Sequence, residues 1–162
     1  MPSREELVPV GIYWDPQLRD NARAAFVADR THDRHAPVTF IDWLDRVLTE
    51  YARLDPHSRA ALGVDPPPAR GRGQGQGVSR MSLVRTSTLE LVDAAIAEDS
   101  SQLGKTRSRS AFIQEAVTVG VEAARQRCPG GVLPPPLSRL PANPHPRRPL
   151  RRRATQPTSS AS

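Results

Sequence analysis

The sequence is poor in the residues that build large or oxidised folds. Cys128 is the single cysteine among 162 residues, which excludes an intrachain disulfide framework and favours a reducing compartment. Aromatic residues make up 4% and hydrophobic residues 37%, while 17 prolines and 10 glycines interrupt the chain. This composition cannot fill one large core. We therefore expect a mainly α protein of short helical modules, separated by linkers and completed by association.

Long apolar runs and a leader-like N-terminus are also missing. No hydrophobic stretch approaches the roughly 20 residues that a membrane span needs, and the basic-then-apolar order of a signal peptide is absent. We expect a soluble cytoplasmic protein with no membrane partner.

Signs of catalysis are lacking too. The four histidines lie in predicted loops, at a helix cap or near the C-terminus, and no Cys/His pair has zinc spacing. No nucleophile stands beside an evident base, and the Gly-x-Gly spacing of 71–77 lacks the Gly-Lys-Ser/Thr of a phosphate loop. We expect no enzyme activity, no cofactor and no metal.

Positive charge is abundant and unevenly distributed. The net charge is +6, with a sequence pI near 10.8. Residues 1–63 carry eight Arg against ten acids, whereas residues 64–162 carry fifteen Arg or Lys against seven acids. An anionic partner such as DNA is therefore expected to bind the second part of the chain.

Residues 7–63 predict an acidic N-terminal helical module. A strand at 7–14 places four large apolar side chains on one side: Val8, Val10, Ile12 and Trp14. Helices then begin after cap residues, of which two precede a proline: Asp15, Thr39 and Asp55. We expect this module to contact other proteins.

A linker, a second module and a tail follow. Residues 64–78 are rich in Pro and Gly and predict a linker. Residues 79–128 predict a strand at 80–85, a helix capped by Thr86 or Ser87, and a longer helix capped by Ser108. Residues 129–162 predict a disordered basic tail that adds non-specific DNA affinity through five arginines: Arg147, Arg148, Arg151, Arg152 and Arg153.

The two modules share the element order strand, helix, turn, capped helix. A spacing of 71 aligns Leu18 with Leu89, and a spacing of 72 aligns Phe40 with Phe112. The likeness lies in pattern rather than identity, and it indicates an internal repeat.

One strand and two helices over about 50 residues bury too little surface to be stable alone. Two copies of the second module can pair their strands antiparallel and interlock their helices as a homodimer. The resulting ribbon is narrow enough for the DNA major groove. Alternatively, the two strands of one chain pair with each other as a pseudo-dimer.

The predicted base-reading residues lie at 80–85. With Met81 and Leu83 turned inward, three side chains face DNA, followed by Arg85: Arg80, Ser82 and Val84. Arginine can address guanine with two hydrogen bonds. A shift of one residue would swap these roles.

A phosphate site is predicted at the start of the last helix. Ser108, Arg109 and Ser110 combine free backbone N–H groups, hydroxyls and a guanidinium at a helix start. Such contacts fix the register on DNA without reading sequence.

These residues carry a family resemblance. MSLVRTSTLELVDAAI followed by RSRSAFIQEAV resembles the ribbon-helix-helix DNA-binding fold. GIYWDPQLRDNARAAFVADR together with SRSAFIQEAV is similar to the small ParB-type centromere-binding proteins of actinobacterial plasmids. The resemblance implies a dimer that binds direct or inverted DNA repeats, assembles further on DNA, and works with a ParA-type ATPase on the plasmid or nucleoid.

Three functions follow as hypotheses. The first is a sequence-specific adaptor of plasmid partition. The second is a transcriptional repressor of the same fold, of the antitoxin or copy-number type. The third is a non-enzymatic scaffold whose basic tail binds polyanions.

Overall fold

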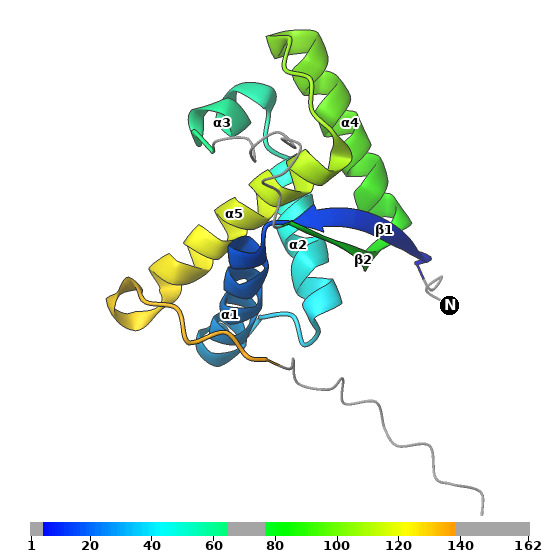
Figure 1. Ribbon diagram of the computed structural model, residues 1–162. Coiled ribbons are helices and arrows are strands. Elements are labelled where there is room, and N and C mark those ends of the chain that lie inside the picture. Colours follow the sequence, from blue (N-terminus) through cyan, green and yellow to red (C-terminus); the bar gives the residue numbers. More distant parts are fainter. Residues whose placement is uncertain (1–4, 65–76, 139–162) are drawn as a thin grey trace, which may run out of the picture.

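The computed structural model describes residues 5–64 and 77–138, which are mainly helical with one small antiparallel sheet (Figure 1). The first unit comprises β1 (Leu7–Trp14), α1 (Pro16–His32), α2 (Phe40–Ala52) and α3 (Pro56–Ala61). The second unit comprises β2 (Val78–Arg85), α4 (Thr86–Leu103) and α5 (Arg109–Arg127), followed by a 3-10 turn at Pro129–Gly131. The predicted order of strand, helix and capped helix is confirmed in both units.

Most of the predicted helix starts are confirmed. The side chain of each predicted cap accepts a hydrogen bond from a backbone N–H three residues on, at Asp15, Thr39, Asp55 and Ser108. The prediction for α4 is wrong, because this helix already includes Thr86 and Ser87. Arg85 stands at its N-cap and makes no capping hydrogen bond with its side chain.

β1 and β2 form an antiparallel ribbon within one chain. Leu7 lies opposite Arg85 and Trp14 lies opposite Val78, so the first residue of each strand meets the last residue of the other. The pairing is therefore symmetric about the midpoints of both strands, as an approximate two-fold axis between the units requires. This corrects the leading expectation of a homodimeric ribbon: the partner of β2 is β1 of the same chain.

The hydrogen-bond phase of the ribbon explains how β1 accommodates a proline. The Thr86 N–H donates to the Glu6 carbonyl at 3.0 Å, one position beyond the end of the ribbon. Because hydrogen-bonded and non-hydrogen-bonded pairs alternate, Pro9 falls in a non-hydrogen-bonded pair with Leu83. Its missing N–H therefore removes no bond from the ladder.

The two units share one hydrophobic core. α1 packs on α5 and α2 packs on both α4 and α5, so helices of the first unit contact helices of the second (Figure 1). The largest fully buried apolar side chains come from both units: Ile12, Phe26, Trp43, Leu44, Leu48, Phe112 and Ile113. Residues 7–63 are thus half of a joint core, which differs from the separate interaction module expected from composition.

α2 and α5 approach each other closely where Val47 meets Gly120. A Cβ atom placed on Gly120 would lie 2.7 Å from Val47 Cγ2, which is shorter than any normal contact. Glycine is therefore needed at this point of α5, because any side chain would push the two helices apart.

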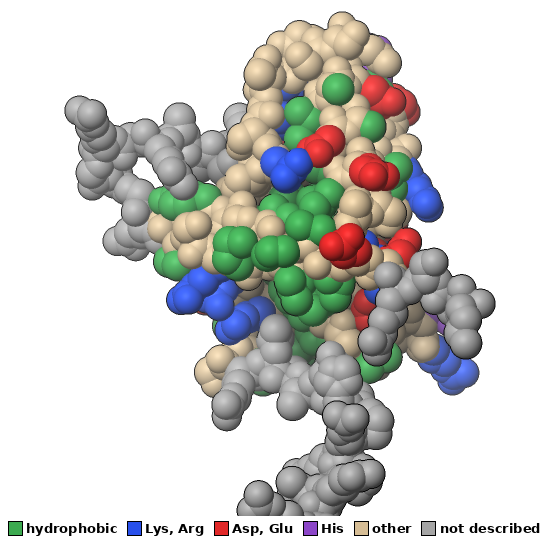
Figure 2. Space-filling view, turned by 90° about the vertical axis from the view of Figure 1, so that its right-hand side faces the viewer, with side chains coloured by type: hydrophobic (Ala, Val, Ile, Leu, Met, Phe, Trp, Pro, Cys, Tyr) green, Lys and Arg blue, Asp and Glu red, His purple; other side chains and the backbone are tan. Residues whose placement is uncertain are grey.

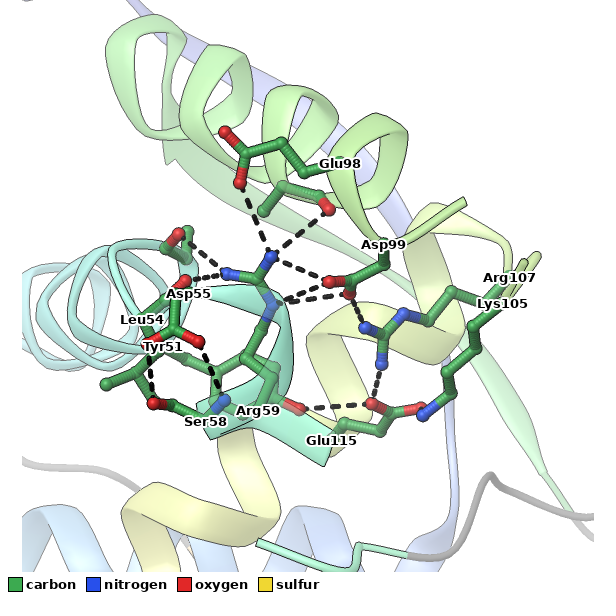
Figure 3. Close-up of polar contacts among 12 residues, drawn as sticks. Tyr51, Leu54, Asp55, Ser58, Arg59, Glu98, Asp99, Lys105, Arg107 and Glu115 are labelled. Atoms are coloured by element: carbon green, nitrogen blue, oxygen red, sulfur yellow. Dashed lines mark hydrogen bonds and ion pairs between the residues drawn. The ribbon is translucent and has the colours of Figure 1, made fainter. Parts of the chain in front are cut away.

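A buried ionic cluster of Tyr51, Arg59, Asp99, Arg107 and Glu115 joins the two units (Figure 3). Arg59 Nη2 of α3 lies 2.7 Å from Asp99 Oδ1 of α4. Arg107 pairs with both Asp99 and Glu115, and Glu115 also accepts a hydrogen bond of 3.1 Å from the Tyr51 hydroxyl. The two buried positive charges thus face two buried carboxylates, as charges removed from water require.

Candidate nucleic-acid interface

The outer face of the ribbon is the side that points away from the helices. It consists of the odd-numbered residues of both strands: Leu7, Pro9, Gly11, Tyr13, Ser79, Met81, Leu83 and Arg85. Met81 is 67% exposed and Leu83 is 41% exposed. The ribbon extends toward the right in Figure 1, and Figure 2, drawn from that side, shows hydrophobic side chains gathered near the centre of the view. This surface is therefore apolar rather than basic.

The predicted phase of β2 is wrong by one residue. Val84 was expected to face DNA, but it is 1% exposed, whereas the exposed Met81 and Leu83 were expected to face inward. The register with β1 determines which side chains of β2 face inward. Val84 lies opposite Val8, and residues that lie opposite each other share a face, so both point toward the helices. A slip of one residue would bury Leu83 and expose Val84, exchanging the two faces.

The other predicted base-reading residues lie in different surroundings. Ser82 is half-buried opposite Val10 on the helix-facing side. Arg80 has the same parity, opposite the fully buried Ile12, but its own side chain is exposed. Arg80 is therefore accessible on the helix-facing side of the ribbon and not on its outer face.

Arg85 is on the outer face but is engaged by three carboxylates. Its guanidinium lies 2.6 Å from Asp42, 2.9 Å from Asp45 and 3.1 Å from Glu5. The hydrogen bond that Arg85 donates to Asp42 and the charge of Asp45 raise the pKa of Arg85 against the opposing effect of burial. These carboxylates make this end of the ribbon acidic.

The residues of the predicted phosphate site have protein partners. Ser108 caps α5, and the Ser110 hydroxyl accepts a hydrogen bond of 2.9 Å from the Tyr13 N–H at the outer edge of β1. Arg109 forms a two-point pair with Asp93, with distances of 3.0 and 2.7 Å. The structure thus brings the start of α5 to the end of the ribbon, where Ser110 holds β1 in place.

A basic group that the sequence reasoning missed lies on α1. Arg19 and Arg23 are one helical turn apart, so they occupy the same side of α1. Burial lowers the pKa of Arg19, and the nearby charges of Arg23 and Arg80 lower it further. The spacing of four between Arg19 and Arg23 was a readable signal, but their closeness to Arg80 depends on the internal pairing of the strands.

The two folded units are themselves almost neutral. Residues 7–63 contain seven Arg against eight acids, and residues 78–128 contain seven Arg or Lys against six acids. The net positive charge of the chain arises from residues 129–162, which contain six Arg and no acid. The five predicted tail arginines at 147–153 lie outside the described residues.

In the part of the chain that the structure describes, no helix combines the length and apolar character needed to cross a membrane. In the same residues, no group of three or more His, Cys, Asp or Glu side chains is arranged to hold a metal ion. Comparison with protein-family models, with curated proteins and with solved structures finds no match to this chain.

Proposed function

We propose that this chain binds double-stranded DNA with the β1–β2 ribbon, both strands of which belong to one molecule. The observation that carries the proposal is the symmetric antiparallel ribbon, packed on helices on one side and exposed on the other. A two-stranded ribbon fits the major groove, which is about 12 Å wide. One chain would then occupy one site, and the two different strands would favour a site without internal symmetry.

Positive charge beside the ribbon supports the proposal. Arg80 belongs to the ribbon, and its charge and that of Arg23 act on Arg19, so the three form a positive group that would neutralise phosphates of a groove that holds the ribbon. The arginine-rich sequence at 146–153 would add affinity that does not depend on base sequence.

A role in plasmid partition extends this proposal and rests on the sequence resemblance. The chain would act as a ParB-type adaptor that binds repeated sites beside a ParA-type ATPase. The alternative of the same class is a transcriptional repressor. A ParA-like reading frame and tandem repeats next to the gene support partition, whereas an adjacent toxin frame supports repression.

The charge distribution favours a second candidate, a scaffold that binds polyanions through its tail. The folded units are nearly neutral, and the excess of arginine lies in residues 129–162. In this candidate the ribbon has no contact with DNA, and loss of the tail alone abolishes binding.

The test measures the affinity of the full chain for duplex DNA from the flanks of its own gene, by fluorescence anisotropy at two salt concentrations. Leu83→Glu places a negative charge on the outer face and is expected to weaken binding by about tenfold or more. The matched control is Leu62→Glu, because Leu62 is 47% exposed at the end of α3, away from the ribbon (Figure 1). Equal affinities for the two variants would contradict the proposal.

Removal of residues 139–162 distinguishes the two candidates. Ribbon binding predicts weaker affinity and a shallower salt dependence, by close to one unit of log–log slope for each lost phosphate contact, with the effect of Leu83→Glu retained. The scaffold candidate predicts no binding by the shortened chain and no effect of Leu83→Glu in the full chain.

A further inference from the structure

The centre of the outer face offers no hydrogen-bonding side chain. Pro9 lies opposite Leu83, and Gly11 lies opposite Met81. A Cβ atom on Gly11 would lie 3.7 Å from Met81 Sδ, so the Met81 side chain lies across the glycine and extends the apolar surface over both strands. The polar side chains of this face stand only near the ends of the ribbon, at Tyr13, Ser79 and Arg85.

This composition limits what the ribbon can recognise. Guanine, cytosine and adenine present hydrogen-bond donors or acceptors in the major groove, and reading them requires polar side chains. Thymine presents, in addition to one acceptor, a methyl group that apolar side chains can contact. Arg85 is the one arginine on the outer face of the ribbon. Its guanidinium is paired with the carboxylates of Asp42, Asp45 and Glu5 and not directed at a base.

Charge favours a polyanion over a second protein as the occupant of this face. Eight residues at about 3.4 Å each give a ribbon about 27 Å long, and two strands give it a width of about 10 Å. The resulting area of roughly 270 Å² is below what either a standard protein interface or a DNA-binding module buries, so neighbouring groups have to add to the contact. Arg19, Arg23 and Arg80, whose charges act on one another, are such groups and complement a polyanion.

We infer that Met81, Leu83 and Pro9 contact thymine methyl groups in the major groove, so that the ribbon selects thymine-containing sites by apolar contact. This inference rests on the proposed function and specifies the ligand of the same surface. Because β1 and β2 differ in sequence, the thymines are arranged without two-fold symmetry in the site.

The experiment compares two duplexes of identical sequence from the flanks of the gene that encodes the chain, one with thymine and one with deoxyuridine, which lacks the methyl group. The full chain is expected to bind the deoxyuridine duplex less tightly, by about fourfold for each methyl that the protein buries. Met81→Ala/Leu83→Ala removes most of the apolar surface and is expected to lose most of the difference in affinity between the two duplexes, since only Pro9 remains. Leu62→Ala is the matched control and keeps the preference for thymine.

The outcomes separate this inference from the proposed function. Loss of the thymine preference only in Met81→Ala/Leu83→Ala supports the inference. Tight binding with no difference between the duplexes contradicts the inference but leaves DNA binding intact. No binding to either duplex contradicts the proposed function itself. A chain dimer that Leu83→Glu dissociates would identify the outer face as a contact between copies and would overturn both.

Discussion

The two strand-helix-helix units have the same order of elements but very different side chains. The first unit contains six of the seven aromatic residues of the chain, and the second contains one, Phe112. The centroid of the Phe112 ring lies 5.2 Å from that of Tyr51, and the second unit otherwise offers aliphatic or small side chains such as Ile113, Ala116 and Gly120 to the core. The aromatic content of the shared core therefore comes almost entirely from the first unit.

This difference shows why the units are not interchangeable. Val47 of α2 contacts Gly120 of α5. At the repeat spacing of 72, Gly120 corresponds to Leu48, so two copies of the first unit would bring Leu48 against Val47 at an approach that has no room for a side chain. Complementary halves favour pairing of the first unit with the second over pairing of two like units.

The largest expected effect on stability comes from replacing a buried aspartate, either Asp29 near the end of α1 or Asp99 near the end of α4. The partners of Asp99 are nearly inaccessible, with side chains that are 1% and 5% exposed, whereas Arg46 and Arg127 beside Asp29 are 26% and 43% exposed. Asp99→Asn leaves two buried guanidinium groups, those of Arg59 and Arg107, beside a single buried carboxylate, that of Glu115, and is expected to cost about 3–5 kcal/mol of unfolding free energy.

Asp29→Asn is expected to cost less, about 1–3 kcal/mol, because water can solvate its arginine partners. Urea unfolding of both variants measures the difference. The control is Asp93→Asn, which affects only an exposed pair with Arg109 and is expected to change stability by less than about 1 kcal/mol. Equal losses at positions 29 and 99 would show that the cluster of Figure 3 does not couple the units more strongly than Asp29 does.

The next effect concerns the contact between α2 and α5. Gly120→Ala is expected to destabilise the fold by about 1–3 kcal/mol, although alanine is the better helix former, because its Cβ collides with Val47. Val47→Ala in the same chain removes the collision, so the double variant should recover much of the loss. Simple additivity of the two single changes in thermal unfolding would contradict the proposed contact.

A smaller effect concerns the first helix of each unit. α1 begins at a side-chain cap, where Asp15 accepts a hydrogen bond of 2.8 Å from the Leu18 N–H, whereas α4 begins without one. Asp15→Ala is expected to cost about 1 kcal/mol. Ser87→Ala, near the start of α4, should change the urea midpoint by less than half as much, and a larger effect would show that Ser87 supports this helix.

The smallest effect concerns α3, which has no counterpart in the second unit. The Ser58 side chain and backbone N–H donate to Asp55 and hold the pKa of this exposed carboxyl below its ordinary value of 3.8. A lowered pKa contributes stability at pH values above 3.8, and this contribution is lost as the pH falls below that value. Carboxyl titration by NMR should show the lowered pKa, and Ser58→Ala should bring it closer to 3.8.

Much of the local structure could be predicted from the sequence. Alternation of four large apolar residues identified the inner face of β1, and the Asp-Pro and Ser or Thr signals located four helix starts. These features depend on neighbours within a few residues, which is why they can be read from short segments.

The pairing and the site could not be read in the same way. In β2, Leu83 and Val84 are adjacent and both apolar, so the segment fits either phase, and the register with β1 decides which is buried. The contact of Arg59 with Asp99 spans 40 positions, and the grouping of Arg19 with Arg80 spans 61. Such long-range contacts leave no local pattern.

The central claim, that both strands of the ribbon belong to one chain, can be tested by a disulfide between Pro9→Cys and Leu83→Cys in a Cys128→Ser background. The two positions form a non-hydrogen-bonded pair, whose Cα separation of about 4.5 Å suits a disulfide. We expect oxidation to give a cross-linked monomer on a non-reducing denaturing gel, at a yield independent of protein concentration. Covalent dimers that disappear on dilution would contradict the account.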